Sequence, residues 1–284
     1  MALGERVFLV RLGFFWRSMY KRIYNENRPA PMFKRSLTAA LSALLILLLA
    51  GTPAGAAELT VSAAASLSNV LRELGPLFEA RHPGTTLQFN FGGSGALLQQ
   101  IAKGAPADVF ASADQETMEQ AQAQGLVKAA ERRNFVSNSL VVIVPAAAKA
   151  QPRAVTELAQ PVYGRIAIGL PASVPVGRYT RAVLEKAGLW TAVEPKMIGA
   201  QNVRQALDYV ARGEVDAGFV YGTDAALMPD KVMVALTVPT ESPVRYPIAP
   251  VAASPHAAEA QQFVAFMLSR EAQAVFAKYG FGKP

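Results

Sequence analysis

The sequence predicts an α/β fold with mostly parallel sheets flanked by helices, and three observations lead to this prediction. Short apolar or alternating segments, typical of strands, take turns with segments in which apolar residues recur at helical spacing. This alternation continues from about residue 58 to the C-terminus without an internal repeat. Several of the strand-like segments, such as "NSLVVIVP", are almost wholly apolar, as strands covered on both faces are. Strands that alternate with helices indicate parallel sheets.

The first predicted strand is "LTVSAA", residues 59–64, and a helix follows over residues 66–81. Five apolar residues lie at helical spacing in this helix: Leu67, Val70, Leu71, Leu74 and Phe78. Pro76 falls inside the pattern and is expected to bend or break the helix, because proline lacks the N–H that the helix needs.

The next segments continue the alternation. Residues 85–91 alternate as a strand, residues 94–104 form a helix closed by Gly104, and residues 107–112 are strand-like. A helix follows over residues 112–125, where the spacing of Ser112 and Gln115 is that of a capping box.

Later segments follow the same order. The predicted strands are residues 138–145, 164–171, 195–200, 216–222, 231–236 and 245–251. The predicted helices are residues 178–188, 202–213 and 256–279.

Residues 1–57 are not expected to belong to this fold. Lys34 and Arg35 precede an apolar run from Leu37 to Ala50, and small residues ending in "AGAA" follow, which is the pattern of a secretory signal peptide cleaved near Ala57. An uncleaved anchor is the alternative, but the run is short for a bilayer. Met32 is the expected true start, with residues 1–31 either a misassigned extension or a genuine one.

Charge and composition restrict the function. The segment removed holds eight of the 28 Lys and Arg and two of the 21 Asp and Glu, so the mature chain has 20 basic and 19 acidic residues and a net charge near +1. This balance gives no support for nucleic-acid binding. The chain has no cysteine, which excludes disulfides, thiolate metal sites, a cysteine nucleophile and a lipid anchor on cysteine. We therefore expect a soluble protein in the periplasm.

Four loops share one design, in which a strand ends, small residues follow and a helix begins. They are "SAAASLSN" with Ser66, "FGGSGAL" with Ser94, "GLPASVPVGRY" shaped by Pro171, Pro175 and Gly177, and "GAQNVRQAL" with Asn202 and Val203. Helix N-termini carry unpaired N–H groups and partial positive charge, and ligands of α/β sheets bind at the carboxyl ends of strands. The four loops together therefore predict an anion site. For Ser66 alone, an ordinary helix cap is the competing interpretation.

The stretch Gly92-Gly93-Ser94-Gly95 is the most informative of these loops. A cap does not need three glycines, so we interpret them as positions where an anion approaches the backbone closely. The stretch also approximates the G-x-S-x-G turn of serine hydrolases, but Ala96 replaces the last glycine. A hydrolase needs a histidine base, and neither His82 nor His256 lies in a loop suited to that role. No cluster has metal-ligand spacing.

A resemblance covers nearly the whole mature chain. The segments "LTVSAAASLSNVL", "GGSGALLQQI", "GAPADVFASAD", "VPVGRY", "GFVYGTDA" and "FAKYGF", in this order, resemble those of the periplasmic molybdate-binding proteins of ABC transporters. The resemblance implies a two-lobed periplasmic-binding-protein-like fold of type 2, with a ligand cleft between the lobes. It implies lobe I over residues 58–137 and 246–284, and lobe II over residues 138–245.

The resemblance also implies a site and a function. Two serine hydroxyls, two backbone N–H groups and a tyrosine hydroxyl would hold the anion, and they fall on Ser66, Ser94, Val176, Val203 and Tyr221. The ligand would be molybdate or tungstate, with another oxyanion such as sulfate as the alternative. A monomer without a cofactor or catalytic residues would deliver it to an ABC permease and ATPase at the inner membrane. Arg178 and Arg204 follow two of the binding loops, and we interpret them as solvated helix surface.

Overall fold

The computed structural model describes residues 57–284. The predictions for the signal peptide, its cleavage site and the true start therefore lie almost wholly outside the described residues. Among the helices of residues 57–284, none is both long and apolar enough to cross a membrane.

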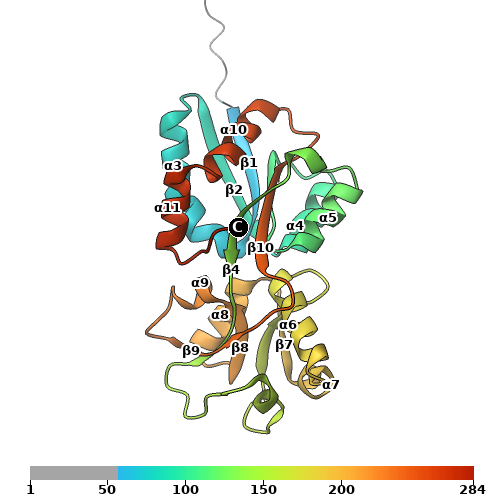
Figure 1. Cartoon of the computed structure of the whole chain (residues 1–284), viewed down its shortest axis with the longest axis vertical. Coiled ribbons are helices and arrows are strands. Elements are labelled where there is room, and N and C mark those ends of the chain that lie inside the picture. The colour runs from blue at the N-terminus through green and yellow to red at the C-terminus, as the bar shows by residue number, and fades with distance from the viewer. Residues whose placement is uncertain (1–56) are drawn as a thin grey trace, which may run out of the picture. The chain divides into compact units, whose positions relative to one another are not determined.

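Two five-stranded sheets form the framework (Figure 1). In the first sheet the strand order is β2-β1-β3-β10-β4. Strand β1 (Ala57–Ala64) runs parallel to β2 (Thr85–Gly92) and β3 (Val109–Ala111), whereas β10 (Val244–Pro250) runs antiparallel to β3 and to β4 (Arg133–Asn138).

The second sheet has the order β7-β6-β8-β5-β9. Strand β6 (Ile166–Gly169) runs parallel to β7 (Met197–Ala200) and β8 (Ala217–Tyr221), and β5 (Leu140–Pro145) runs antiparallel to β8 and β9 (Val232–Val238). The chain passes from the first sheet to the second between β4 and β5, and returns between β9 and β10. The expected two-lobed α/β fold is thus confirmed, and the numerical limits of the lobes stay a prediction.

Each sheet is mixed, because the strands that flank the two crossings run against their neighbours. No helix lies between β4 and β5 or between β9 and β10. After each crossing the first strand, β5 or β10, therefore enters its sheet antiparallel to its neighbours. The alternation of strand and helix patterns did not predict this detail.

Helices flank both sheets (Figure 1). Helices α3, α10 and α11 lie on one side of the first sheet and α4 and α5 on the other, and α6 to α9 flank the second sheet. Their bounds are α3 Ser68–Arg81, α4 Ser94–Ala102, α5 Gln115–Ala123, α6 Pro175–Lys186, α7 Trp190–Val193, α8 Val203–Ala211, α9 Gly222–Ala225, α10 Ala257–Met267 and α11 Arg270–Lys278.

Helix α3 continues through Pro76, so the expected break at this proline was wrong. Proline removes one hydrogen bond to the carbonyl four residues earlier, that of Arg72. Both Pro76 and Arg72 are exposed, so water can satisfy that carbonyl. The buried face, with Leu71, Leu74 and Phe78, packs against the first sheet and holds the helix together.

The capping box expected at Ser112 was also wrong. Helix α5 begins at Gln115, and Asp114 is its N-cap: the Asp114 carboxylate accepts from the Thr117 N–H at 3.2 Å. Ser112 Oγ instead donates to Asp114 Oδ1 at 3.0 Å and so fixes the capping side chain. A carboxylate at the helix N-terminus also interacts favourably with the helix dipole.

Gly177 shows how tightly the first turn of α6 packs on β6. A Cβ atom on Gly177 would overlap the carbonyl oxygen of Gly169. We expect Gly177→Ala to lower the free energy of unfolding by roughly 1–3 kcal/mol through overpacking. Gly164→Ala is the matched control, because the nearest atom to an added Cβ there is 3.7 Å away. Thermal unfolding of both variants checks this, and equal melting temperatures would contradict the packing described.

Candidate functional site

The five residues predicted for the site line one cavity. The cavity is small: its free volume is about 10 Å³, which is room for about one water-sized group. Its walls come from segments that follow strands of both sheets. The lining residues are Ala64, Ala65, Ser66, Gly92, Gly93, Ser94, Ala113, Val174, Pro175, Val176, Val203 and Tyr221.

Ser94 is the first residue of α4 and is fully buried. Its Oγ accepts a hydrogen bond from the Ala113 N–H at 3.1 Å. This bond uses a lone pair of the oxygen and leaves the hydroxyl hydrogen unused. Ser94 can therefore still donate a hydrogen bond to a ligand in the cavity. Ala113 was not predicted as part of the site.

Ser66 lies in a short helical turn, Ala65–Leu67, between β1 and α3. Its Oγ is 3.0 Å from the hydroxyl oxygen of Tyr246, and Asn138 Nδ2 donates to the same Tyr246 oxygen at 3.3 Å. While Tyr246 accepts from Asn138, its own hydroxyl hydrogen is free to be donated to Ser66, and in that arrangement the Ser66 hydroxyl hydrogen is left for the cavity. Burial raises the pKa of Tyr246 well above its usual value, so the phenol stays protonated near neutral pH.

Tyr246 and Asn138 lie on β10 and β4, the two first-sheet strands at the crossings. Neither residue was predicted as part of the site. A sequence signal for them is weak, since a tyrosine in an apolar strand is usually a core residue.

Val176 and Val203 occupy the first turns of α6 and α8. Val203 is the first helical residue after the N-cap Asn202, whose side chain accepts from the Gln205 N–H at 3.1 Å. Val176 follows Pro175, which is at the favoured first helical position. Both valine side chains are buried in the core. Their N–H groups belong to the helix turns that lack intrahelical acceptors.

Tyr221 ends β8 and presents a buried hydroxyl to the cavity. Within residues 57–284, this oxygen has no hydrogen-bond partner. Burial raises the pKa of Tyr221 well above its usual value, so the hydroxyl is a donor near neutral pH. A buried, unpaired hydroxyl costs free energy until an acceptor arrives, which is what an oxyanion would supply.

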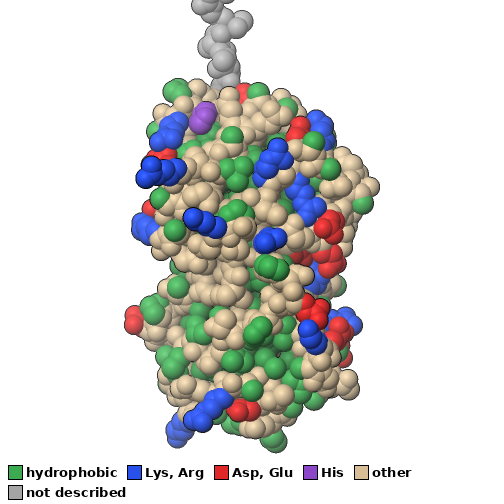
Figure 2. All heavy atoms as spheres, viewed as in Figure 1, with side chains coloured by type: hydrophobic (Ala, Val, Ile, Leu, Met, Phe, Trp, Pro, Cys, Tyr) green, Lys and Arg blue, Asp and Glu red, His purple; other side chains and the backbone are tan. Residues whose placement is uncertain are grey.

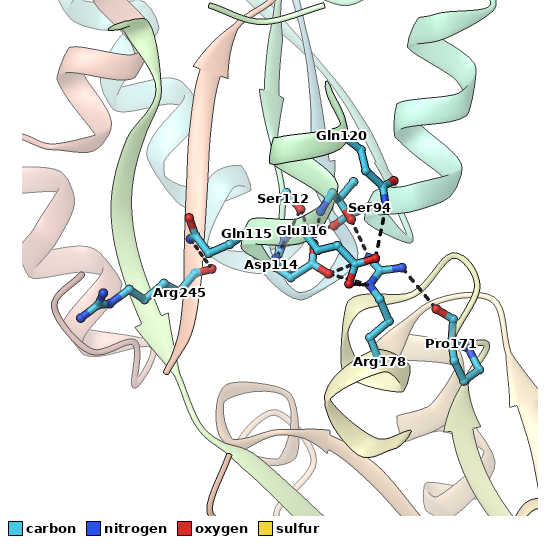
Figure 3. Close-up of polar contacts among 11 residues, drawn as sticks. Ser94, Ser112, Asp114, Gln115, Glu116, Gln120, Pro171, Arg178 and Arg245 are labelled. Carbon is cyan, nitrogen blue, oxygen red and sulfur yellow. Dashed lines mark hydrogen bonds and ion pairs between the residues drawn. The ribbon is translucent and has the colours of Figure 1, made fainter. Parts of the chain in front are cut away.

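Two buried carboxylates flank the cavity without lining it, and each is paired with an arginine. Arg178 Nη2 lies 2.6 Å from Asp114 Oδ2, and Arg204 Nε lies 2.6 Å from Asp224 Oδ1. The Arg178 contacts are drawn in Figure 3. Arg204 Nη2 also donates to the Ser66 carbonyl at 3.0 Å. The interpretation of Arg178 and Arg204 as solvated helix surface was therefore wrong, because both reach across to first-sheet segments.

Asp224 is fully buried in α9, just beyond Tyr221. Its contact with Arg204 is an ion pair poorly aligned for a hydrogen bond, since neither carboxylate oxygen has a well-directed donor among the described residues. Desolvation by burial outweighs Arg204 and raises the pKa of Asp224 to about 6. The cavity itself is lined by no carboxylate.

The glycines of the "GGSG" stretch make room for backbone from the second lobe. A Cβ on Gly93 would lie 2.7 Å from the Gln201 carbonyl oxygen, and one on Gly95 would lie 2.8 Å from the Ser173 carbonyl oxygen. The Gly95 N–H donates to that Ser173 oxygen at 3.0 Å. Close approach is indeed the reason for these glycines, but at Gly93 and Gly95 the crowding group is the opposing backbone. The interpretation of these glycines as positions of close approach to an anion did not include this contact with the opposing backbone.

Hydrolytic and metal chemistry find little support in this geometry. No histidine lines the cavity around Ser94, and the His82 ring instead stacks on Phe78, with Nδ1 2.9 Å from the Phe78 carbonyl oxygen. Residues 57–284 hold no group of three or more His, Cys, Asp or Glu side chains that could bind a metal ion.

Known proteins are similar to this chain in sequence and in fold. The family described as "Bacterial extracellular solute-binding protein" matches residues 59–282. A putative ABC transporter substrate-binding lipoprotein of Bacillus subtilis, YvgL, is 40% identical over 225 residues, which are 78% of this chain and 85% of that protein. The molybdate-binding protein ModA of Escherichia coli is 36% identical over 232 residues, 79% of this chain and 88% of ModA.

A solved structure agrees with these relatives. The periplasmic molybdate-binding protein of Azotobacter vinelandii aligns with a TM-score of 0.67 and 28% identity, over 80% of this chain and 99% of that one. Together with the family match over nearly all described residues, this places the chain: it belongs to the bacterial extracellular solute-binding proteins.

Proposed function

We propose that this protein captures molybdate or tungstate outside the cytoplasm and presents it to an ABC importer. The observation that carries the proposal is the small cavity between segments of both sheets, which is lined by residues with hydroxyl and backbone N–H groups and by no carboxylate. Relatives named for molybdate binding support the choice of anion. The proposed ligand-binding residues are Ser66, Ser94, Val176, Val203 and Tyr221.

Neutral donors suit a tetrahedral dianion. Such an ion must lose its water on entering the closed cavity, so each of its oxygens needs a donor in exchange. The N-termini of α4, α6 and α8 meet at the cavity and add partial positive charge. Ser66, Ser94 and Tyr221 contribute hydroxyl hydrogens, and the Tyr221 hydroxyl gains the acceptor that it otherwise lacks.

The remaining assignments follow from this role. We infer binding without catalysis, by a monomer in the periplasm after cleavage near Ala57, with an ABC permease and ATPase as partners. No cofactor and no nucleic acid enter the proposal. On the face drawn in Figure 2, basic side chains are interspersed with acidic ones and form no continuous stripe, which supports leaving nucleic acid out.

Calorimetric titration with molybdate, tungstate, sulfate and phosphate at pH 7 tests the proposal. We expect molybdate and tungstate to bind with similar affinity, because they are tetrahedral dianions of nearly equal size. Sulfate binding more tightly than either would transfer the role to the alternative oxyanion. Absence of binding by all four anions would refute the proposal.

Ser94→Ala removes the hydroxyl and keeps the backbone N–H. A hydrogen bond to a charged group contributes roughly 1.5–3 kcal/mol, so we expect molybdate affinity to fall by about ten- to a hundredfold. Ser68→Ala is the matched control, since the Ser68 hydroxyl bonds only to the exposed Asn69 side chain. Unchanged affinity in Ser94→Ala would remove this serine from the site.

Two substitutions at Val203 distinguish a role of its backbone N–H from a role of its side chain. Val203→Ala keeps the N–H, so we expect nearly unchanged affinity. Val203→Pro deletes the N–H at a first helical position where proline is well tolerated, and the extended Asn202 before it is compatible. We expect Val203→Pro to bind molybdate at least about tenfold more weakly by titration. Loss of binding in Val203→Ala with the fold intact would contradict the backbone role.

The proton that phosphate carries should make it bind more weakly than molybdate. At neutral pH phosphate carries at least one O–H, which needs an acceptor. The cavity lining includes no carboxylate, and its hydroxyls could accept only by turning away from the other ligand oxygens. An unpaired buried O–H costs roughly 1–3 kcal/mol, so we expect phosphate to bind at least about tenfold more weakly than molybdate. Competition at pH 7 measures this. Displacement of molybdate by equal phosphate would mean that an acceptor faces the ligand.

A further inference from the structure

Arg178 joins the two lobes next to the cavity (Figure 3). It lies on α6, of the second lobe, two residues after Val176. Its Nε donates to Asp114 Oδ2 at 2.8 Å, and its Nη2 donates to Thr117 Oγ1 at 2.5 Å. Both acceptors belong to the start of α5, in the first lobe. On its own side, Arg178 Nη1 donates to the Pro171 carbonyl at 3.3 Å, which orients the guanidinium.

Asp114 is fixed to the segment that orients Ser94. It follows Ala113, whose N–H donates to Ser94 Oγ. Its Oδ1 accepts from Ser112 Oγ and from the Thr117 N–H, so the carboxylate has one orientation. The other oxygen, Oδ2, is the one that meets Arg178. The ion pair between the lobes is therefore one residue away from Ala113, whose N–H orients the proposed ligand contact Ser94.

The charge of Asp114 is the reason that this pair matters. The residue is only 4% exposed, and it follows Ala113, which lines the cavity proposed to take a dianion. An uncompensated buried carboxylate there is costly by itself and repels the anion. Glu116 does not compensate it, being acidic and mostly exposed. Among the described residues, Arg178 is the cation that contacts Asp114, and it comes from the opposite lobe.

We propose that Arg178 is a positioning residue that couples closure of the lobes to anion capture. When the lobes are apart, water solvates Asp114. Closure removes that water, and Arg178 replaces it while the segment of Ala113 and Ser94 is held in place. The inference rests on the proposed function, because it makes Arg178 necessary for tight binding of an oxyanion that it does not touch.

The test is a double-mutant cycle on the dissociation constant for molybdate. Arg178→Gln should weaken binding by at least about tenfold, because closure then buries an unpaired carboxylate. Asp114→Asn removes that charge and keeps a good N-cap. The double variant should therefore bind more tightly than Arg178→Gln alone. Arg181→Gln is the matched control: Arg181 lies on the same helix, but it is half exposed and pairs with Glu185.

Two further measurements separate positioning from a merely structural role. Arg178→Lys keeps the charge without the planar fork, so its affinity should fall between those of the parent and Arg178→Gln. The rise in melting temperature on adding molybdate should be smaller in Arg178→Gln than in the parent. Equal affinity in parent and Arg178→Gln, or a double variant weaker than both single variants, would overturn the proposal.

Measuring a distance between the lobes tests the role of Arg178 independently of the proposed function. The chain has no cysteine, so spin labels can be placed on Ala102→Cys in α4 and Ala187→Cys after α6, both exposed. Without ligand, the Arg178→Gln chain should show a larger fraction of long distances than the labelled parent. Identical distributions would overturn the role of Arg178, whether or not molybdate binds. Failure of the unmutated protein to bind any oxyanion would overturn the proposed function alone.

Discussion

An anion stripped of water needs a hydrogen-bond donor for every oxygen and no negative charge facing it, and the structure around the cavity follows this constraint. Hydroxyls and backbone N–H groups border the cavity, and carboxylates do not. The donors stand at the starts of helices, where N–H groups are unpaired in any case. The fold therefore supplies most of the donors without burying a positive side chain against the ligand.

The same constraint explains the polar groups behind the cavity. Ser94 accepts from the Ala113 N–H, which leaves the Ser94 hydroxyl hydrogen for the cavity, and Ser66 Oγ is 3.0 Å from the Tyr246 hydroxyl, which can act as its donor. Behind this layer, Asp114 and Asp224 are paired with arginines from α6 and α8. The two helices that offer N–H groups to the cavity thus also carry the cations that compensate the nearby carboxylates.

Sequence patterns predicted the α/β class because strands and helices have different periods, and the resemblance supplied the two lobes and the five cavity residues. The patterns failed where tertiary contacts decide. Pro76 stays helical because its cost falls on an exposed carbonyl while the other face is packed. Arg178 and Arg204 have the spacing of a solvated helix face, and only the opposing lobe shows their partners. Tyr246 and Asn138 meet Ser66 from distant strands, which no local pattern encodes.

The role of the glycines was predicted only in part from the sequence. Their number in the "GGSG" stretch indicates that something approaches the backbone, but the sequence does not say what. The structure gives the Gln201 and Ser173 carbonyl oxygens as the groups that a side chain at Gly93 or Gly95 would strike. The stretch therefore lets backbone of the two lobes approach closely beside the cavity.

The central claim is that one oxyanion sits among Ser66, Ser94, Val176, Val203 and Tyr221. Anomalous diffraction at the molybdenum edge, from crystals grown with molybdate, tests it most directly. The account predicts one strong peak in this cavity, with ligand oxygens at hydrogen-bond distance from the three hydroxyls and the two backbone nitrogens. A peak elsewhere, or a molybdate in the cavity that makes no contact with these donors, would contradict it.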